Sequence, residues 1–135
     1  MKISTRGRYA LLLMIDLAAH YGTGPVALRE AAQRQGLSEH YLEQLMGPLR
    51  SGGLVHSVRG AAGGYYLAKH PEEITAGHVI RQMEGPTEVV AGLDPAAIDA
   101  PVWLAVNEAI DEALNRFSLA ELAHGEDEAA FMFYI

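Results

Sequence analysis

Residues 27–45 read ALREAAQRQGLSEHYLEQL, and this stretch decides the fold. It predicts a short helix that Gly36 ends, a tight turn, and a second helix over 39–50 that Ser38 caps. Two helices joined by a three- to four-residue turn that contains glycine form a helix-turn-helix. Pro48 lies inside the second helix, where its missing N–H predicts a kink or an early end.

The hydrophobic period changes from about 3.6 to 2 after residue 53. Residues 54–59 alternate like a strand, and a second short run over 65–68 follows a glycine-rich loop. Two short strands joined by such a loop predict a β-hairpin. A helix-turn-helix followed directly by a hairpin is a winged helix, so the predicted fold class is mostly α with a small β component (α+β).

Helices are also predicted on both sides of this unit. Residues 4–21 carry apolar side chains at helical spacing, and Thr75 is placed to cap a helix over 76–84. Residues 101–117 carry an apolar seam in steps of three and four, typical of a helix that packs on its twin. The alternative is that the seam covers its own domain. We expect a homodimer that uses Trp103, Val106, Ile110, Ala113 and Phe117, with Glu108, Asp111, Glu112 and Asn115 on an opposite, solvated face.

Four consecutive segments are expected from these signals. They are a winged-helix DNA-binding domain over 1–84, a connector loop over 85–100, a dimerisation helix with a short capping helix over 101–125, and a tail over 126–135. The short capping helix is predicted from a serine followed three residues later by a glutamate, the pattern of a capping box. The tail reads EDEAAFMFYI, an acidic spacer followed by an apolar end.

Charge is divided unevenly along the chain. The 135 residues carry a formal net charge of −7. Residues 1–70 hold eight Lys and Arg against four acids, whereas residues 71–135 hold two against thirteen. Such polarity predicts one face that meets a polyanion while the rest repels it. The alternative is that charged segments simply lie where solvent allows.

Several function classes are excluded or disfavoured. The absence of cysteine excludes disulfides, thiol nucleophiles and cysteine-ligated metal centres. The six histidines show no close metal-ligand spacing, and no hydrolase or phosphate-loop motif occurs, so we expect neither an enzyme nor a metal site. No window approaches the roughly 20 apolar residues of a membrane span, and no secretory cleavage pattern occurs, so we expect a cytoplasmic protein without a membrane partner.

The helix-turn-helix and its wing are the predicted contact surface for double-stranded DNA. A helix fits the major groove, where Gln44 can pair with adenine, and an arginine at the wing tip can enter the minor groove or hold a phosphate. Basic residues near the N-terminus are expected at phosphates, and Tyr41 has half-buried packing as its alternative role. The predicted DNA-binding residues are Lys2, Thr5, Arg6, Arg8, Ser38, His40, Tyr41, Gln44, Arg59 and Gly60.

Four stretches carry a resemblance to a known family: MKISTRGRYA (1–10), LSEHYLEQL (37–45), LRSGGLV (49–55) and RGAAGGY (59–65). Together they resemble the Rrf-two (Rrf2) family of bacterial winged-helix regulators over essentially the whole chain. The resemblance implies a homodimer that binds a palindromic operator through the third helix and the wing. Many members bind an iron–sulfur cluster through three cysteines in the connector. This sequence has no cysteine, so no cofactor is expected.

Within the family, the SEHYLEQL run, Gly85-Pro86 and the Met-Phe-Tyr-Ile end are similar to the cysteine-metabolism repressors of Gram-positive bacteria. This likeness implies repression of sulfur-uptake and cysteine-synthesis genes, with cysteine synthase (O-acetylserine thiol-lyase) as a partner. Such synthases accept C-terminal isoleucine peptides, so Phe133, Tyr134 and Ile135 are the expected partner-binding residues. The alternative for the tail is packing against the dimer core.

Two other functions remain open at this point. One is a regulator of the same fold that binds its own small effector, with the connector over 86–100 as the expected site. The other is a winged-helix adaptor that binds only protein, which predicts no salt-dependent DNA affinity.

Overall fold

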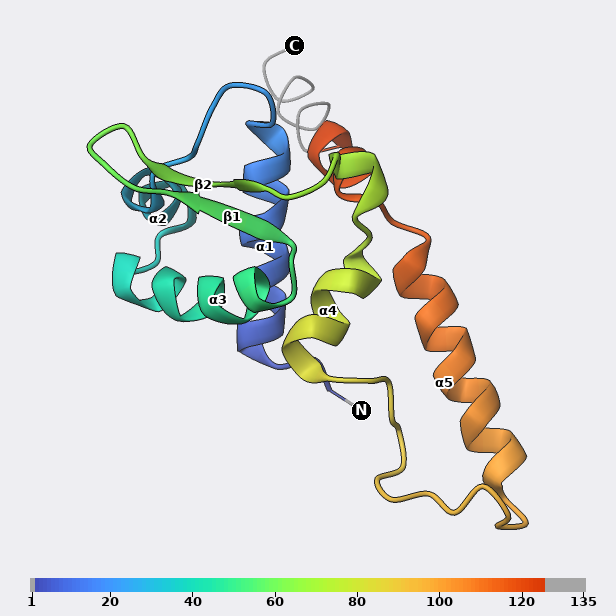
Figure 1. Cartoon of the computed structure of the whole chain (residues 1–135). Helices are drawn as coiled ribbons and strands as arrows, with labels where there is room; N and C mark the ends of the chain where they lie inside the picture. The colour runs from blue at the N-terminus through green and yellow to red at the C-terminus, as the bar shows by residue number, and fades with distance from the viewer. Residues whose placement is uncertain (1, 126–135) are drawn as a thin grey trace.

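The computed structural model describes residues 2–125 (Figure 1). Within them, a bundle of helices carries one two-stranded antiparallel sheet, which confirms the predicted fold class. Residues 119–125 are also helical. The elements in order are α1 (Thr5–Ala19), α2 (Leu28–Gln35), α3 (Glu39–Ser51), β1 (Val55–Val58), β2 (Gly64–Leu67), the 3-10 helix η1 (Pro71–Glu73), α4 (Ala76–Glu84) and α5 (Ala100–Asn115).

The helix starts follow the local signals in the sequence. The Ser4 hydroxyl accepts the Gly7 N–H at 3.0 Å, and the Ser38 hydroxyl accepts the Tyr41 N–H at 3.1 Å. Each bond satisfies one of the N–H groups that a first helical turn leaves without a partner. Gly36 ends α2 with φ +67°, a backbone conformation that favours glycine.

Pro48 does not end α3 early, so that part of its prediction is wrong. The helix continues to Ser51. The Pro48 carbonyl accepts two hydrogen bonds at 2.9 Å, one from the Gly52 N–H and one from Nε2 of Gln82 on α4. Because these bonds hold the last turn in place, the missing proline N–H costs little there.

The core lies around α1, which runs through the middle of the body between α3 and α4 (Figure 1). α1 contributes small and large apolar residues to it, and α2, α3 and both strands close over them. Burying such side chains yields about 1.5–3 kcal/mol each. The largest fully buried side chains are Leu13, Met14, Leu42, Leu45, Met46, Leu49, Val55, Ile74, Val79 and Leu119.

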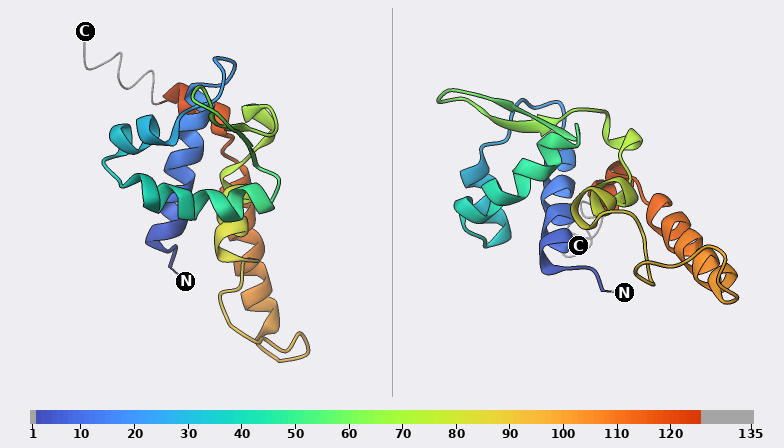
Figure 2. Two further views of the ribbon diagram at one scale, coloured as in Figure 1. Left: turned by 60° about the vertical axis from the view of Figure 1, so that its left-hand side comes forward. Right: turned by 60° about the horizontal axis from the view of Figure 1, so that its bottom comes forward.

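The two strands form the predicted wing. Val55 pairs with Leu67 at the base, and Val58 pairs with Gly64 at the outer end. The loop between the strands projects beyond the helices in Figure 1 and in the right view of Figure 2. A separate bridge joins β2 to the α1–α2 loop, where Val26 and Tyr65 exchange two N–H···O bonds of 2.8 and 2.9 Å. The bridge therefore fixes the hairpin to the body one residue from the outer end of β2.

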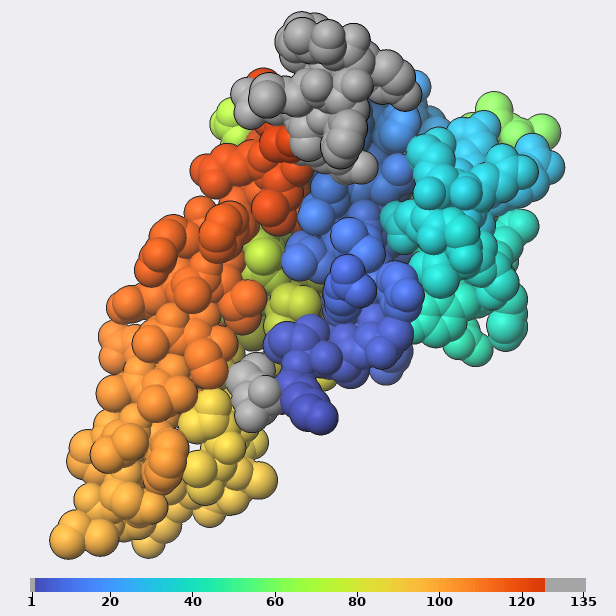
Figure 3. All heavy atoms as spheres, turned by 180° about the vertical axis from the view of Figure 1, so that it is seen from behind, coloured from blue at the N-terminus to red at the C-terminus, as the bar shows by residue number. Residues whose placement is uncertain are grey.

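α5 and the connector form an arm that extends past the body (Figure 3). Its contact with α4 is polar: Arg81 donates to Asp111 at 3.2 Å and to Asn115 at 2.8 Å. In the connector, the Val89 N–H donates to the Asn107 side chain at 3.0 Å. Asp111 and Asn115 thus face α4 and share one cation there, although Asn115 stays exposed and Asp111 half-exposed.

The apolar seam of α5 faces mostly outward. Val106 and Phe117 are exposed, as is Val102 beside them, while Trp103 and Ile110 are half-buried. Ala113 is exposed too. Within residues 100–115, only Ala100 is fully buried. The exposed part of the seam therefore covers nothing within the described residues, whereas Trp103 and Ile110 are partly covered by the chain itself.

No helix among the described residues is long and apolar enough to cross a membrane.

Candidate nucleic-acid interface

α3 presents a polar face next to a buried one. Leu42, Leu45 and Leu49 point into the core and are fully buried. On the other side, His40 and Gln44 are exposed one turn apart, and their Nε2 atoms lie 3.3 Å from each other. The helix is thus anchored by its leucines and leaves its hydrogen-bonding side chains His40 and Gln44 exposed on the opposite face.

Tyr41 takes the packing role that the sequence left as an alternative. Its ring is half-buried and meets the ring of Tyr9 edge to face, with centroids 6.1 Å apart. Such pairs contribute about 0.5–1.5 kcal/mol beyond their buried area. Tyr41 therefore fixes the start of α3 against α1, and its contact with DNA stays a prediction.

The wing tip has the backbone that a tight loop needs. Arg59 is exposed directly after β1, and Gly60 has φ +110°, where other residues are strained. The Gly63 N–H donates to the Gly60 carbonyl at 3.0 Å, and a Cβ at Gly63 would collide with the Val58 carbonyl. Gly60 and Gly63 therefore allow the tight loop that directly follows Arg59.

The predicted N-terminal contacts lie apart from the wing. Lys2, Thr5, Arg6 and Arg8 are exposed at the start of α1. In the left view of Figure 2 the wing loop, α3 and the first turn of α1 follow one another from top to bottom. The structure therefore brings the predicted residues onto one side of the molecule in three groups, with α3 in the middle.

The charges on this side are mixed. Glu39 and Glu43 are exposed on α3, and Arg50 is exposed in its last turn. Arg50 was not among the DNA-binding residues predicted from the sequence. Gly47 and Arg50 follow Glu43 by four and seven residues, so helical spacing places all three on one side of α3 and could have pointed to Arg50.

Arg34 is bound elsewhere. It donates to both carboxylate oxygens of Asp16, at 2.8 and 2.7 Å, and the hydrogen bond to Asp16 raises its pKa. Such a two-pronged pair fixes the guanidinium in one geometry. Arg34 therefore joins α2 to α1, and its charge is already balanced.

The connector has no ligands for an iron–sulfur cluster. The chain has no cysteine, and residues 2–125 hold no group of three histidines or carboxylates that could bind a metal ion. Iron–sulfur clusters need thiolates, with histidine replacing only some of them. The residues present do not fit such a group.

Comparisons with known proteins agree with this geometry. Residues 3–125 match the Rrf2 family, described as an iron-dependent transcriptional regulator. The chain is 50% identical over its full length to the HTH-type transcriptional regulator CymR of Bacillus subtilis, all of which it covers. It is 39% identical to the regulator IscR of Serratia proteamaculans, covering 94% of this chain and 82% of that one.

Solved structures show the same fold. The structure of B. subtilis CymR, "the Global Cysteine Regulator", matches with a TM-score of 0.79 and 49% identity, over 92% of this chain and 97% of that one. The structure of T. potens IscR matches with a TM-score of 0.79 and 46% identity, over 96% and 90%. These relatives are transcriptional regulators and not enzymes. The chain described here belongs to the Rrf2 family of transcriptional regulators.

Proposed function

We propose that this protein is a homodimeric repressor that binds a palindromic operator and controls genes of cysteine and sulfur metabolism. In this proposal it receives its metabolic signal through a complex with cysteine synthase. The DNA-binding part rests on α3, whose buried leucines hold His40 and Gln44 outward. In this proposal α3 lies in the major groove, and Gln44 accepts from and donates to an adenine. Arg59 enters the adjacent minor groove or holds a phosphate.

Phosphate contacts supply much of the affinity in this proposal. Lys2, Arg6 and Arg8 at the start of α1 flank α3 on the side away from the wing. The Thr5, Ser38 and Gly60 positions add short side chains or bare backbone that let phosphates approach. Each neutralised phosphate releases counterions, so affinity falls steeply with salt.

A second copy of this chain is the proposed occupant of the α5 seam. The supporting observation is that α5 turns Asp111 and Asn115 toward α4 and leaves Val106 exposed to solvent, as is Phe117 two residues after the helix. A two-fold dimer places two α3 helices on one face, which suits half-sites about 34 Å apart or a multiple of that. We divide the chain accordingly into a reading domain (1–84), a connector (85–100), a dimer arm (101–125) and a tail (126–135).

The regulated pathway is proposed from the relatives. B. subtilis CymR is titled a global cysteine regulator, and this chain matches it from end to end. A regulator that binds chromosomal DNA works in the cytoplasm. The proposed partner-binding residues Phe133, Tyr134 and Ile135 lie outside the described residues. Their chemistry, an apolar segment followed by a carboxylate, suits capture of a C-terminus in a pocket.

Titration with cysteine synthase tests the sensing mechanism. Purified synthase is added to the wild-type chain and to a chain ending at Phe131, and operator binding is then measured. We expect association of the wild type only, with a changed operator affinity in the complex. Both chains must bind operator equally when synthase is absent, which controls for folding. Equal association of both chains, or none with either, overturns the tail-capture mechanism and leaves DNA binding intact.

A further inference from the structure

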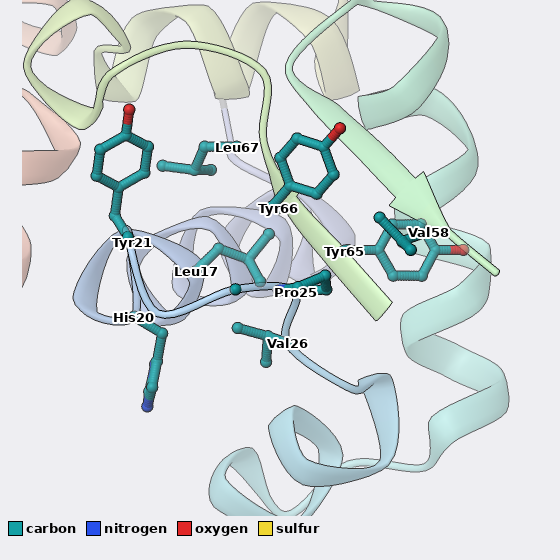
Figure 4. Close-up of a pocket in the computed structure, with 11 residues that line it drawn as sticks. Leu17, His20, Tyr21, Pro25, Val26, Val58, Tyr65, Tyr66 and Leu67 are labelled. Carbon is teal, nitrogen blue, oxygen red and sulfur yellow. The ribbon is translucent and has the colours of Figure 1, made fainter. Parts of the chain in front are cut away.

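A pocket of about 500 Å³ lies at the base of the wing (Figure 4). The end of α1, the α1–α2 loop and the two strands enclose it. Leu17 and Val26 form its floor, and Tyr66, Leu67 and Val58 come from the hairpin. Its size is that of small-molecule sites, which are concave and mostly apolar.

The pocket offers rings and methyl groups but no charge. Among its lining residues, His20 is the one basic side chain, and Figure 4 shows that its ring points away from the cavity. Its Nδ1 lies 2.8 Å from the Asp16 carbonyl oxygen. The backbone groups of Val26 and Tyr65 are already satisfied by their mutual bridge. A charged ligand would therefore lose hydration here without meeting a side chain of opposite charge.

Three large side chains at the rim are exposed although they are apolar or aromatic. Tyr21 is 47% exposed, and Tyr66 and Val58 are each 41% exposed. Folded proteins usually group such side chains where something binds. Each of the two tyrosine rings packs against a histidine ring outside the pocket. The ring centroids of Tyr21 and His70 lie 5.1 Å apart, and those of Tyr66 and His56 lie 5.5 Å apart. Fixed rings lower the entropy lost on binding.

We propose that this pocket binds a small, flat, uncharged aromatic molecule between Tyr21 and Tyr66. Aromatic rings at the rim favour a ring as the ligand, because stacked and edge-to-face pairs add to the gain from burial. The absence of a facing charge favours a neutral molecule. A hollow closed on three sides by α1, the loop and the hairpin suits a compact ligand better than a strand or helix of another protein.

The site touches the wing directly. Val58 lines the pocket, and the next residue is Arg59 at the wing tip. A ligand that contacts both Tyr21 on the body and Val58 on β1 favours the wing positions that allow both contacts. If the wing takes different positions in the free and the DNA-bound protein, operator affinity changes by the ratio of the ligand's affinities for those two positions. This coupling rests on the proposed role of the wing at DNA, whereas ligand binding itself does not.

Indole is a suitable probe for the site. Full-length protein with isotope-labelled tyrosine rings is titrated with indole without DNA, and the ring signals are followed by NMR. We expect Tyr21, Tyr65 and Tyr66 to shift together and Tyr9 and Tyr41 to stay in place. Indole-3-acetate, which adds a negative charge, and cyclohexanol, which lacks the aromatic ring, should each bind at least about tenfold more weakly.

A double variant, Tyr21→Ser with Tyr66→Ser, tests the location. Both side chains are exposed, so the fold is kept, and indole affinity should fall at least about tenfold. Leu12→Ser, at a separate hollow between α1, α2 and Leu122 that also holds the Asp16–Arg34 pair, is the control and should leave indole affinity unchanged. Equal shifts of all tyrosines, or equal affinity in the double variant, overturn the site. Indole binding that leaves wild-type operator affinity unchanged overturns the coupling to the wing.

Discussion

Replacing Gln44 by alanine separates reading of DNA from stability of the fold. Gln44 is exposed on α3 and contacts only His40 among the hydrogen bonds found for it, at 3.3 Å. Alanine is at least as good a helix former. The free energy of unfolding should therefore change by less than about 0.5 kcal/mol, as for most surface substitutions.

The loss at DNA should be much larger. One amide paired with an adenine discriminates by about 1–3 kcal/mol. The proposed dimer uses Gln44 twice, so Gln44→Ala should cost about 2–6 kcal/mol on a full operator, which is at least about 30-fold in affinity. The dependence on salt should not change, because the amide neutralises no phosphate.

Fluorescence anisotropy with an operator selected from random DNA by the wild-type protein measures this effect. Each base pair of the half-site is then changed in turn, and Gln44→Ala should lose its preference at one position only. Gln33→Ala, an exposed glutamine on α2, is the matched control and should bind like the wild type. If Gln44→Ala weakens binding to all sequences equally, or no more than Gln33→Ala does, α3 does not read DNA through this residue.

Val106→Asp, on the exposed seam of α5, should yield a monomer in sedimentation equilibrium, and an unchanged mass would contradict the proposed dimer face. Arg59→Ala should lower the slope of log affinity against log salt by about 0.9 for each half-site, while an equal slope would mean that the wing holds no phosphate. Leu49→Ala, in the fully buried core, should cost about 2–5 kcal/mol in urea unfolding, and a loss below about 1 kcal/mol would show that α3 is not anchored there. Burial, followed by the charges of Arg81 and Lys69, lowers the pKa of His78 from its usual 6.5, so the unfolded chain binds more protons and stability should fall as the pH drops below about 6.5. His78→Gln should flatten that fall in urea titrations between about pH 5 and 8, and an identical pH profile would exclude the histidine as its source.

Most of the fold can be predicted from local signals in the sequence. The caps at Ser38 and Thr75 act on N–H groups only three residues away, so the sequence alone predicts where α3 and α4 begin. For α1 the sequence offers Ser4 or Thr5 as the cap, and the structure has Ser4. Gly36 likewise stops α2 through its own backbone angle. These features need no knowledge of the rest of the chain.

Contacts between distant segments were not predictable in the same way. The Pro48 carbonyl accepts a hydrogen bond from Gln82 on another helix, 34 positions later, and no local motif predicts that partner. The pocket under the wing depends on the Val26–Tyr65 bridge, which joins a loop to a strand without any sequence motif. Periodicity shows which face of a helix or strand is buried, but it does not show which other segment covers that face.

The α4–α5 contact shows why the polar face of α5 matters for the proposed dimer. A Cβ at Gly77 would collide with Oδ1 of Asn115, so glycine there leaves room for the Asn115 side chain between α4 and α5. Arg81 then bonds both Asp111 and Asn115, one helical turn apart on α5. An apolar contact tolerates sliding, whereas two directional hydrogen bonds from one guanidinium fix the rotation of one helix against the other. In the proposed dimer the distance between the two α3 helices depends on that rotation, so the polar face sets the half-site spacing while the apolar seam supplies the affinity of the two copies.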